Sequence, residues 1–266
     1  MRILISNDDG IEAEGIWILA REIANRGHHT IIACPMRQQS GMSHALTIGR
    51  PLEVKRIDRD PKIEAWAIDG SPTDCVKIFL ESMCHWELQR EHSTKFNREI
   101  PYEKDRQPMP DAVLSGINHG SNLATDVLYS GTVGAALEGF IHELPSMAVS
   151  LKNESELSFE SAAKIAADFF ESTLQKNSKP FLYNINFPDK LREEKIVFTR
   201  LGRRDYVNAF RKTHDDLGRT FFEIKGEVYD TDGSEGTDLH AIREGLISVT
   251  PLHIDPTDYS HIKEEI

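Results

Sequence analysis

Two adjacent carboxylates, Asp8 and Asp9, stand where an apolar run ends and Gly10 allows the chain to turn. They repel each other unless a positive charge lies between them, and a divalent cation meets that need with one ion. At the end of a strand both side chains can reach the same ion, because they no longer alternate between opposite faces. The alternative is that both acids cap the next helix and favour its positive end.

Neutral oxygen donors occur in two later loops, with Ser40 in the segment RQQSG and Asn118 in the segment SGIN. Ligand sets made only of oxygen select hard cations such as Mg²⁺, Mn²⁺ or Ca²⁺, whereas a structural zinc site uses Cys or His. A single loop Ser or Asn is more often a turn residue. The prediction of a metal site therefore depends on the combination of Ser40 and Asn118 with the acidic pair.

The segment SGTVGAALEG brings Ser130, Gly131 and Thr132 to the start of a predicted helix. Free backbone N–H groups and the positive end of the helix dipole suit a phosphate, although an ordinary N-cap followed by small packing residues has the same appearance. Asn7 and Gly41, in the loops that carry the acidic pair and Ser40, are further candidates for phosphate contacts.

A phosphate beside an acidic metal site indicates metal-assisted hydrolysis of a phosphoester. In that reaction a metal-polarised water attacks phosphorus, and Asp8 or Asp9 accepts a proton. His119, next to Asn118, could donate a proton, but a solvent-facing place in a loop is the simpler interpretation of this histidine.

Two other features predict structure rather than chemistry. The acidic segment DTDGSEGTD at 230–238 lacks glycine at the position that an EF-hand loop requires, and we interpret it as a turn. The three cysteines, Cys34, Cys75 and Cys84, form no C-x-x-C pair and are predicted to be reduced thiols in the core.

Alternating apolar segments predict a βαβ unit at the start of the chain and more units after it. Strands are predicted at 2–7, 28–35, 111–118, 146–152 and 180–188, and helices at 14–27, 71–83, 132–145 and 159–174. The predicted fold is α/β, a Rossmann-like three-layer domain whose mainly parallel sheet has at least five strands. Such sheets bind ligands beyond the carboxyl ends of their strands, where the candidate loops would converge.

The pattern changes near residue 190 to short β-like runs joined by Asp, Gly and Thr-rich turns. We expect residues 1–189 to form the catalytic domain and residues 190–266 a β-hairpin-rich region used in oligomerisation, because exposed strand edges favour pairing with another subunit. The polar segment 86–110, which contains three prolines, is predicted to be a surface insertion.

Composition narrows the class of protein. The 266 residues are 39% hydrophobic and 28% charged, and no stretch approaches the roughly 18 apolar residues that a membrane span needs. The short apolar start does not resemble a secretory signal, so we expect a cytoplasmic protein with no membrane partner. A net charge of −12 opposes binding to nucleic-acid duplexes.

Several long blocks together resemble the SurE family, the survival-protein metal-dependent 5'/3'-nucleotidases. They are ILISNDDGIEAEGI, RQQSGMSHALT, DGSPTDCVKI, PDAVLSGINHGSNLATDVLYSGTVGAALEG, NINFP, TRLGRR and TDLHAIREGLISVTPL, in the family's order. The resemblance implies hydrolysis of nucleoside monophosphates to nucleoside and phosphate and, in some members, cleavage of short polyphosphate. It also implies a Rossmann-like domain, a β-rich C-terminal part and a homodimer or homotetramer.

The family's single divalent ion, usually Mg²⁺ or Mn²⁺, is held at positions that match Asp8, Asp9, Ser40 and Asn118. The sequence departs from the family where Gln38 replaces the usual Asn after Arg37, and the segment 86–110 is longer than the family pattern.

Two other classes remain as alternatives. A receiver-like module that senses metal or nucleotide also places an acidic pair after its first strand, but it is about half this length and needs a phospho-accepting Asp that we cannot place. A haloacid-dehalogenase-type phosphatase needs Asp-x-Asp after the first strand, where this chain has Asp8-Asp9-Gly10.

Overall fold

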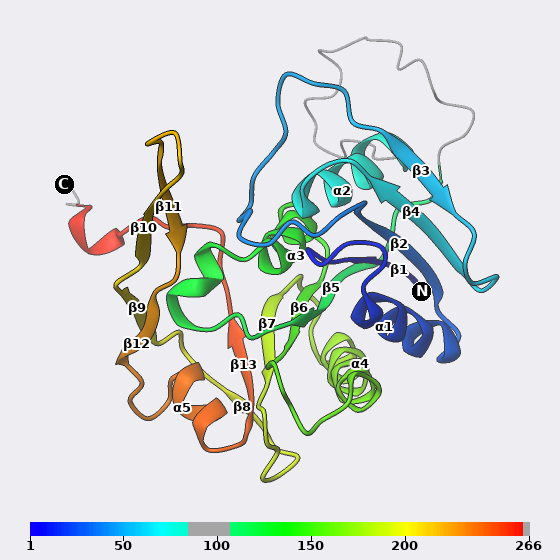
Figure 1. The fold of residues 1–266 in the computed structure, drawn as a ribbon. Coiled ribbons are helices and arrows are strands. Elements are labelled where there is room, and N and C mark those ends of the chain that lie inside the picture. The colour runs from blue at the N-terminus through cyan, green and yellow to red at the C-terminus, as the bar shows by residue number, and fades with distance from the viewer. Residues whose placement is uncertain (85–106, 263–266) are drawn as a thin grey trace.

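The structure is a computed structural model that describes residues 1–84 and 107–262. Its central element is a nine-stranded sheet with the strand order β3-β4-β2-β1-β5-β6-β7-β13-β8 (Figure 1). The strands of this sheet are β1 (Arg2–Ser6), β2 (His29–Pro35), β3 (Val54–Ile57), β4 (Ile63–Ile68), β5 (Ala112–His119), β6 (Ser146–Leu151), β7 (Leu182–Phe187), β8 (Ile196–Phe198) and β13 (Ile247–Pro251).

The middle of the sheet is parallel, and its edges are mixed. All pairs from β4 through β2, β1, β5 and β6 to β7 are parallel. Strand β3 pairs antiparallel with β4, β13 pairs antiparallel with β7, and β8 lies parallel to β13. The strand order reverses at β1, because β2 lies on one side of it and β5 on the other. This reversal is the point at which open α/β sheets bind ligands.

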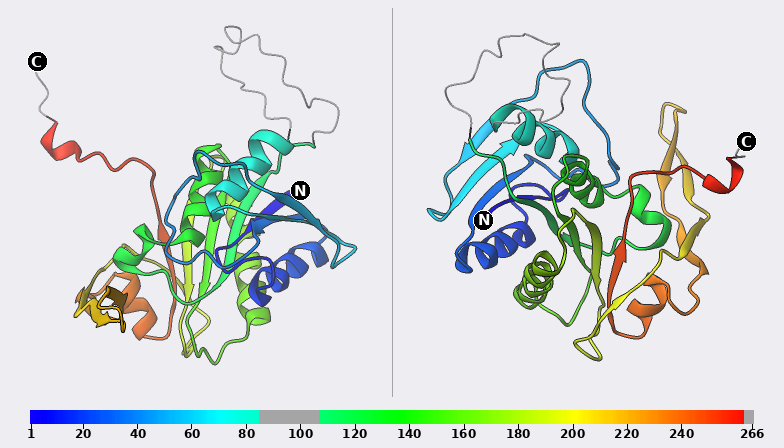
Figure 2. Two further views of the ribbon diagram at one scale, coloured as in Figure 1. Left: turned by 45° about the horizontal axis from the view of Figure 1, so that its top comes forward. Right: turned by 180° about the vertical axis from the view of Figure 1, so that it is seen from behind.

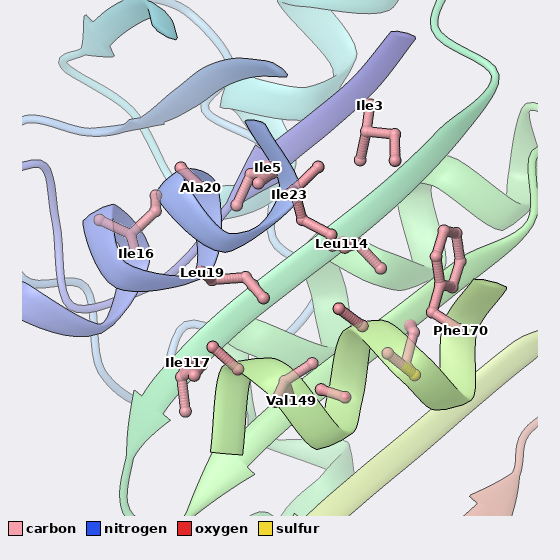
Figure 3. Packing of buried hydrophobic residues seen from close by; sticks show 14 of the residues in the cluster. Ile3, Ile5, Ile16, Leu19, Ala20, Ile23, Leu114, Ile117, Val149 and Phe170 are labelled. Carbon is pink, nitrogen blue, oxygen red and sulfur yellow. The ribbon is translucent and has the colours of Figure 1, made fainter. Parts of the chain in front are cut away.

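Two layers of helices cover the sheet, which confirms the α/β prediction (Figure 1). One layer is α1 (Glu14–Asn25) with α4 (Phe159–Lys176), and the other is α2 (Pro72–Ile78) with α3 (Gly131–Ile141). Figure 3 shows Ile16, Leu19 and Ile23 of α1 in the same cluster as Leu114 of β5 and Phe170 of α4. Burial of each such side chain stabilises the fold by about 2 kcal/mol.

Three of these helices have a serine as their N-cap residue. Ser71 accepts a hydrogen bond from the Asp74 N–H, and Asp74 accepts one from the Ser71 N–H, so α2 starts with a complete capping box followed by Pro72. Ser130 caps α3 and Ser158 caps α4 through a single hydrogen bond, which the serine side chain accepts from the N–H three residues later. The cap at Ser130 fixes the helix end that contacts Asp8 through Thr132.

The C-terminal segment forms antiparallel hairpins, as predicted, and also contributes two strands to the main sheet (Figures 1 and 2). Strands β9 (Arg203–Val207) and β12 (Glu227–Asp232) pair with each other, and so do β10 (Phe210–His214) and β11 (Thr220–Ile224). Helix α5 (Asp238–Arg243) then leads into β13. Because β8 and β13 complete the same sheet, the division into residues 1–189 and 190–266 stays a prediction.

Three further structural predictions concern the cysteines, the insertion and membrane-spanning segments. All three cysteines are buried free thiols, as predicted, and burial raises the pKa of each. The predicted insertion lies outside the described residues up to position 106. Among the helices of the described ranges, none is both long and apolar enough to cross a membrane.

Candidate metal and phosphate site

The acidic pair lies in the loop that follows β1, and Asn7 closes this loop. Asn7 Oδ1 accepts a hydrogen bond from the Gly10 N–H at 3.1 Å, and Asn7 Nδ2 donates to the Gly10 carbonyl at 3.0 Å. Gly10 has a φ of 90°, and a Cβ there would lie 2.9 Å from the carbonyl carbon of Arg37. Because φ is positive and the loop that contains Arg37 lies so close, only glycine fits at position 10. Asn7 thus holds the turn, and its contact with phosphate stays a prediction.

Asp8 contacts the start of α3. Its Oδ1 accepts a hydrogen bond from the Thr132 hydroxyl, and a Cβ on Gly131 would lie only 2.9 Å from the Asp8 Cβ. The residue is 5% exposed. Burial raises the pKa of Asp8 to about 6, the bond from Thr132 opposes this shift, and the charge of Asp9 adds to it.

Asp9 joins the other two loops. Its Oδ2 accepts a hydrogen bond from the His119 N–H at 3.1 Å, directly after Asn118. The Gln38 amide lies at its other side, with Nε2 3.5 Å from Asp9 Oδ1 and 3.0 Å from Ser40 Oγ. Asp9 therefore lies between the loop of Ser40 and the strand end of Asn118.

Asn118 and Ser130 complete the arrangement. Asn118 Nδ2 donates to the Gly120 carbonyl at 2.7 Å, which fixes the amide nitrogen and leaves Oδ1 as the atom suited to a cation. Ser130 Oγ accepts the hydrogen bond of the Val133 N–H at 3.1 Å as the N-cap of α3. Gly41 is exposed, with a φ of 73° and no other atom within 4 Å of the place that a Cβ would occupy.

These contacts connect every loop that the sequence singled out. Besides the bonds already described, the Gln39 N–H donates to the Asp8 carbonyl at 2.7 Å. The four predicted ligands, Asp8, Asp9, Ser40 and Asn118, are thus linked through hydrogen-bonded neighbours at the carboxyl edge of the sheet. Whether they bind a metal stays a prediction.

The donor set fits a hard divalent cation. It consists of oxygen atoms from two carboxylates, a hydroxyl and an amide, which are ligands typical of Mg²⁺ and Mn²⁺. Among the ion pairs of the described residues, none involves Asp8 or Asp9. The raised pKa of Asp8 is the consequence expected for a buried carboxylate that has a like charge beside it and no cationic partner in the described part of the chain.

Comparisons with known proteins identify the family. A family model described as Survival protein SurE matches residues 3–208. The chain belongs to the SurE family. A SurE-family protein of Synechococcus elongatus, named 5'-nucleotidase SurE, is 40% identical over 99% of this chain and 98% of its own length. A protein of the same name from Desulforamulus reducens is 41% identical over 99% of this chain and 97% of its own length.

The fold agrees with a solved structure of the SurE family. The crystal structure of a SurE protein from Aquifex aeolicus superimposes with a TM-score of 0.73 at 35% sequence identity, and the match covers 98% of this chain and 96% of that one. The resemblance inferred from the sequence blocks is therefore confirmed along nearly the whole chain.

Two contacts at this SurE-family site were not predicted from the sequence. Thr132 was proposed as a phosphate contact, and the structure places its hydroxyl on Asp8. Gln38, which replaces the usual Asn of the family, bridges Asp9 and Ser40. Its position two residues before Ser40 was the available signal, but the sequence does not show to which side a long side chain turns.

A second group of potential metal ligands lies elsewhere in the described part of the chain. Ligand atoms of Glu81, Glu138 and His142 lie within 4.8 Å of one another. The Lys77 ammonium lies against them, 2.6 Å from Glu81 Oε1 and 3.2 Å from Glu138 Oε1. Because this lysine already supplies a positive charge to both carboxylates, we interpret the group as a partly buried ion-pair network.

Two candidates remain from the sequence analysis, His119 and the acidic segment 230–238. The His119 side chain is exposed and packs edge-on against Phe159 with ring centroids 6.2 Å apart. In the segment 230–238, Asp230 pairs with Arg204 and Arg243, and Asp232 pairs with Arg200. The segment consists of the end of β12, a turn at 235–236 and the start of α5, so the predicted turn is confirmed only for its middle.

Proposed function

We propose that this SurE-family protein hydrolyses nucleoside 5'- and 3'-monophosphates to nucleoside and phosphate, with one divalent cation, Mg²⁺ or Mn²⁺, in each subunit. The observation that carries the proposal is the contact of Asp8 with the first turn of α3. A carboxylate pair suits a cation and a helix N-terminus suits a phosphate, so their contact favours metal-assisted cleavage of a phosphomonoester. Relatives named 5'-nucleotidase SurE support nucleotidase activity.

The residues divide into two proposed roles. Asp8, Asp9, Ser40 and Asn118 would hold the cation, which when bound would neutralise phosphoryl charge and polarise a water molecule. The N–H groups at the start of α3, from Ser130 to Thr132, would receive the phosphate oxygens, with Asn7 and Gly41 as further contacts. Short polyphosphate would fit the same anion site and is a further proposed substrate.

The protein side chains then act on the water and the leaving group. Asp9, which is less buried than Asp8, accepts a proton from the attacking water as the new phosphorus–oxygen bond forms and the bond to the nucleoside oxygen breaks. Thr132 holds Asp8 in place through its hydroxyl. The proton for the leaving nucleoside oxygen comes from solvent or from His119, which is exposed at the edge of the site.

We further propose that the protein acts as a homodimer or homotetramer. Support comes from apolar side chains that are exposed along the hairpins: Tyr206, Val207, Phe210, Phe221, Phe222, Ile224, Val228 and Tyr229. Large exposed apolar surface of this kind is typical of protein–protein contacts. Sedimentation equilibrium would test this assembly, and a monomer at micromolar concentration would contradict it.

The test of the activity is phosphate release from 5'-AMP and 3'-AMP by chelator-stripped protein, with Mn²⁺ or Mg²⁺ added back. Asp9→Asn removes one proposed ligand charge, and Asp58→Asn is the matched control because Asp58 lies on the surface with its side chain 86% exposed. We expect turnover that requires the cation, is retained in Asp58→Asn and falls by about 10²-fold or more in Asp9→Asn. Turnover without added cation, or an Asp9→Asn rate within twofold of wild type, would contradict the proposal.

A further inference from the structure

The two halves of the proposed site are joined by one stretch of chain, residues 119–130, which we call the strap. The strap begins directly after Asn118 at the end of β5 and ends at Ser130, the N-cap of α3. A shift of the strap would move Ser130, a proposed phosphate contact, and would also disturb the side chain of the proposed ligand Asn118, whose Nδ2 donates to the Gly120 carbonyl of the strap. What fixes the strap also fixes their relative position.

Side chains from the interior of the sheet hold the strap at Asn122. The Asn122 N–H donates to Asn186 Oδ1 at 2.8 Å, and the Asn122 side chain donates to Ser150 Oγ at 2.8 Å. The Asn122 carbonyl accepts two hydrogen bonds, from Asn184 Nδ2 at 2.8 Å and from Asn186 Nδ2 at 3.0 Å. The backbone polar groups and the amide of this residue are thus bound by β6 and β7.

The polar residues of the sheet that bind Asn122 are unfavourable in a hydrophobic core. Asn184, Asn186 and Ser150 are fully buried in the middle of the nine-stranded sheet, where apolar side chains are the rule. Asn184 Oδ1 has no hydrogen-bond partner among the described residues. An unpaired buried carbonyl oxygen destabilises a fold, so stability alone does not explain an asparagine at this position.

The rest of the strap is held from other parts of the chain. Buried Asp238 of α5 accepts the Ala124 N–H at 2.7 Å. Near the other end, the Ser43 hydroxyl donates to the Leu128 carbonyl at 2.6 Å, and the Ser43 N–H donates to the Tyr129 carbonyl at 2.9 Å. The contacts at Asn122 come from side chains of the parallel core, and the Gly120 N–H adds a backbone hydrogen bond to the Leu151 carbonyl of β6 at 2.8 Å.

We propose that Asn184 and Asn186, the two asparagines of the segment NINFP, are positioning residues that set the place of Asn118 and Ser130 through Asn122. They touch neither cation nor substrate, and they act by holding the strap. The proposal rests on the proposed function, because it gives these asparagines a role in the same cation and phosphate site.

The test uses Asn184→Leu, which keeps the branching and the number of heavy atoms of the side chain and removes both the hydrogen bond to the strap and the unpaired oxygen. Asn186 still bonds the Asn122 carbonyl in this variant, so the protein is expected to fold with a melting temperature equal to or above that of wild type. Mn²⁺ affinity, measured by the free-ion electron paramagnetic resonance signal, is expected to weaken about tenfold, as for other residues that orient metal ligands. The KM for 5'-AMP is expected to rise as well.

Ser248→Ala is the matched control, because Ser248 is also fully buried in the sheet and bonds Thr199 instead of the strap. It should leave Mn²⁺ affinity and KM unchanged. If Asn184→Leu lowers the melting temperature but leaves Mn²⁺ affinity and KM as in wild type, its role is structural and the inference is wrong. If wild type itself binds no Mn²⁺, the proposed function fails and the inference fails with it.

If Asn184→Leu does not fold, Asn184→Ala provides the same test with a smaller side chain. It removes the bond from Asn184 to the Asn122 carbonyl and leaves the bonds between Asn186 and Asn122. The inference requires weaker Mn²⁺ binding in this variant too, and unchanged binding would overturn it.

Discussion

Removal of the Asp8 charge should stabilise the metal-free protein. Burial raises the pKa of Asp8 from 3.8 to about 6 in the folded chain, so at neutral pH the fold contains an ionised carboxylate in a place that disfavours it. The shift is roughly two pKa units, and one unit corresponds to about 1.4 kcal/mol. The ionised form therefore lowers the free energy of unfolding by about 3 kcal/mol at pH 7.5.

The direction of the pH dependence follows from the raised pKa. Well below the unfolded-state pKa of 3.8, Asp8 is protonated in both states and does not change the stability. The penalty develops as the pH rises from 3.8 to about 6 and then stays constant. Asp8→Asn keeps a side-chain oxygen for the Thr132 hydroxyl and never ionises. The variant should thus be about 3 kcal/mol more stable than wild type at pH 7.5 and nearly equal to it at pH 4.

Urea unfolding of chelator-stripped protein, followed by circular dichroism at both pH values, measures this difference. Asp58→Asn serves as the control and should differ from wild type by less than about 0.5 kcal/mol. Mn²⁺ at about 1,000 times its Kd should then reverse the order, because a ligand at that concentration adds about 4.1 kcal/mol to a protein that binds it. A metal-free Asp8→Asn that is less stable than wild type at pH 7.5 would refute the reasoning.

Three further outcomes follow from contacts of the described residues. Gly131→Ala should weaken Mn²⁺ affinity about tenfold in a titration, because the new Cβ would lie 2.9 Å from the Asp8 Cβ and displace this proposed ligand. Unchanged Mn²⁺ affinity would contradict the proposal that the position of Asp8 is critical. Glu138→Gln should lower the free energy of unfolding by about 2 kcal/mol at pH 7, since the bond from His44 and the charge of Lys77 hold the pKa of Glu138 below its usual 4.5 against the opposing effect of burial. Because the folded-state pKa of Glu138 is lowered, this stabilisation is present above pH 4.5 and is lost as the pH falls through the folded pKa. A stability difference between wild type and Glu138→Gln that grows in acid would contradict this reasoning. The native protein should show no thiol that reacts quickly with a disulfide reagent among Cys34, Cys75 and Cys84, whereas unfolded protein should show all of them; rapid reaction of a native thiol would contradict their burial.

The sequence predicted the parts of the fold that local patterns determine. Periodic apolar residues placed α1 within two residues of its observed end, and Ser71 with Pro72 marked the start of α2. The strands β3 and β4 were not predicted, because β3 is exposed along most of its length and the apolar run of β4 is too short for its periodicity to distinguish a strand from a helix. The membership of β8 and β13 in the main sheet also depends on long-range pairing that no local pattern records.

The candidate site, like the fold, has features that the sequence predicted and features that it did not. Loops that follow parallel strands meet at one edge for geometric reasons, so Asp8, Asp9, Ser40 and Asn118 could be grouped without a structure. The contacts between side chains could not be predicted, because they depend on rotamers and on loop packing. The bond from Thr132 to Asp8 and the bonds between the sheet and Asn122 are contacts of this kind.

The most direct measurement is an anomalous difference map from crystals grown with Mn²⁺. The predicted result is one strong peak at the carboxyl end of β1, with oxygen atoms of Asp8, Asp9, Ser40 and Asn118 at about 2.2 Å, a distance typical of oxygen ligands to such cations. A map with its peak at Glu81, Glu138 and His142, or with no peak beside Asp8 and Asp9, would contradict the claim that the acidic pair holds the cation.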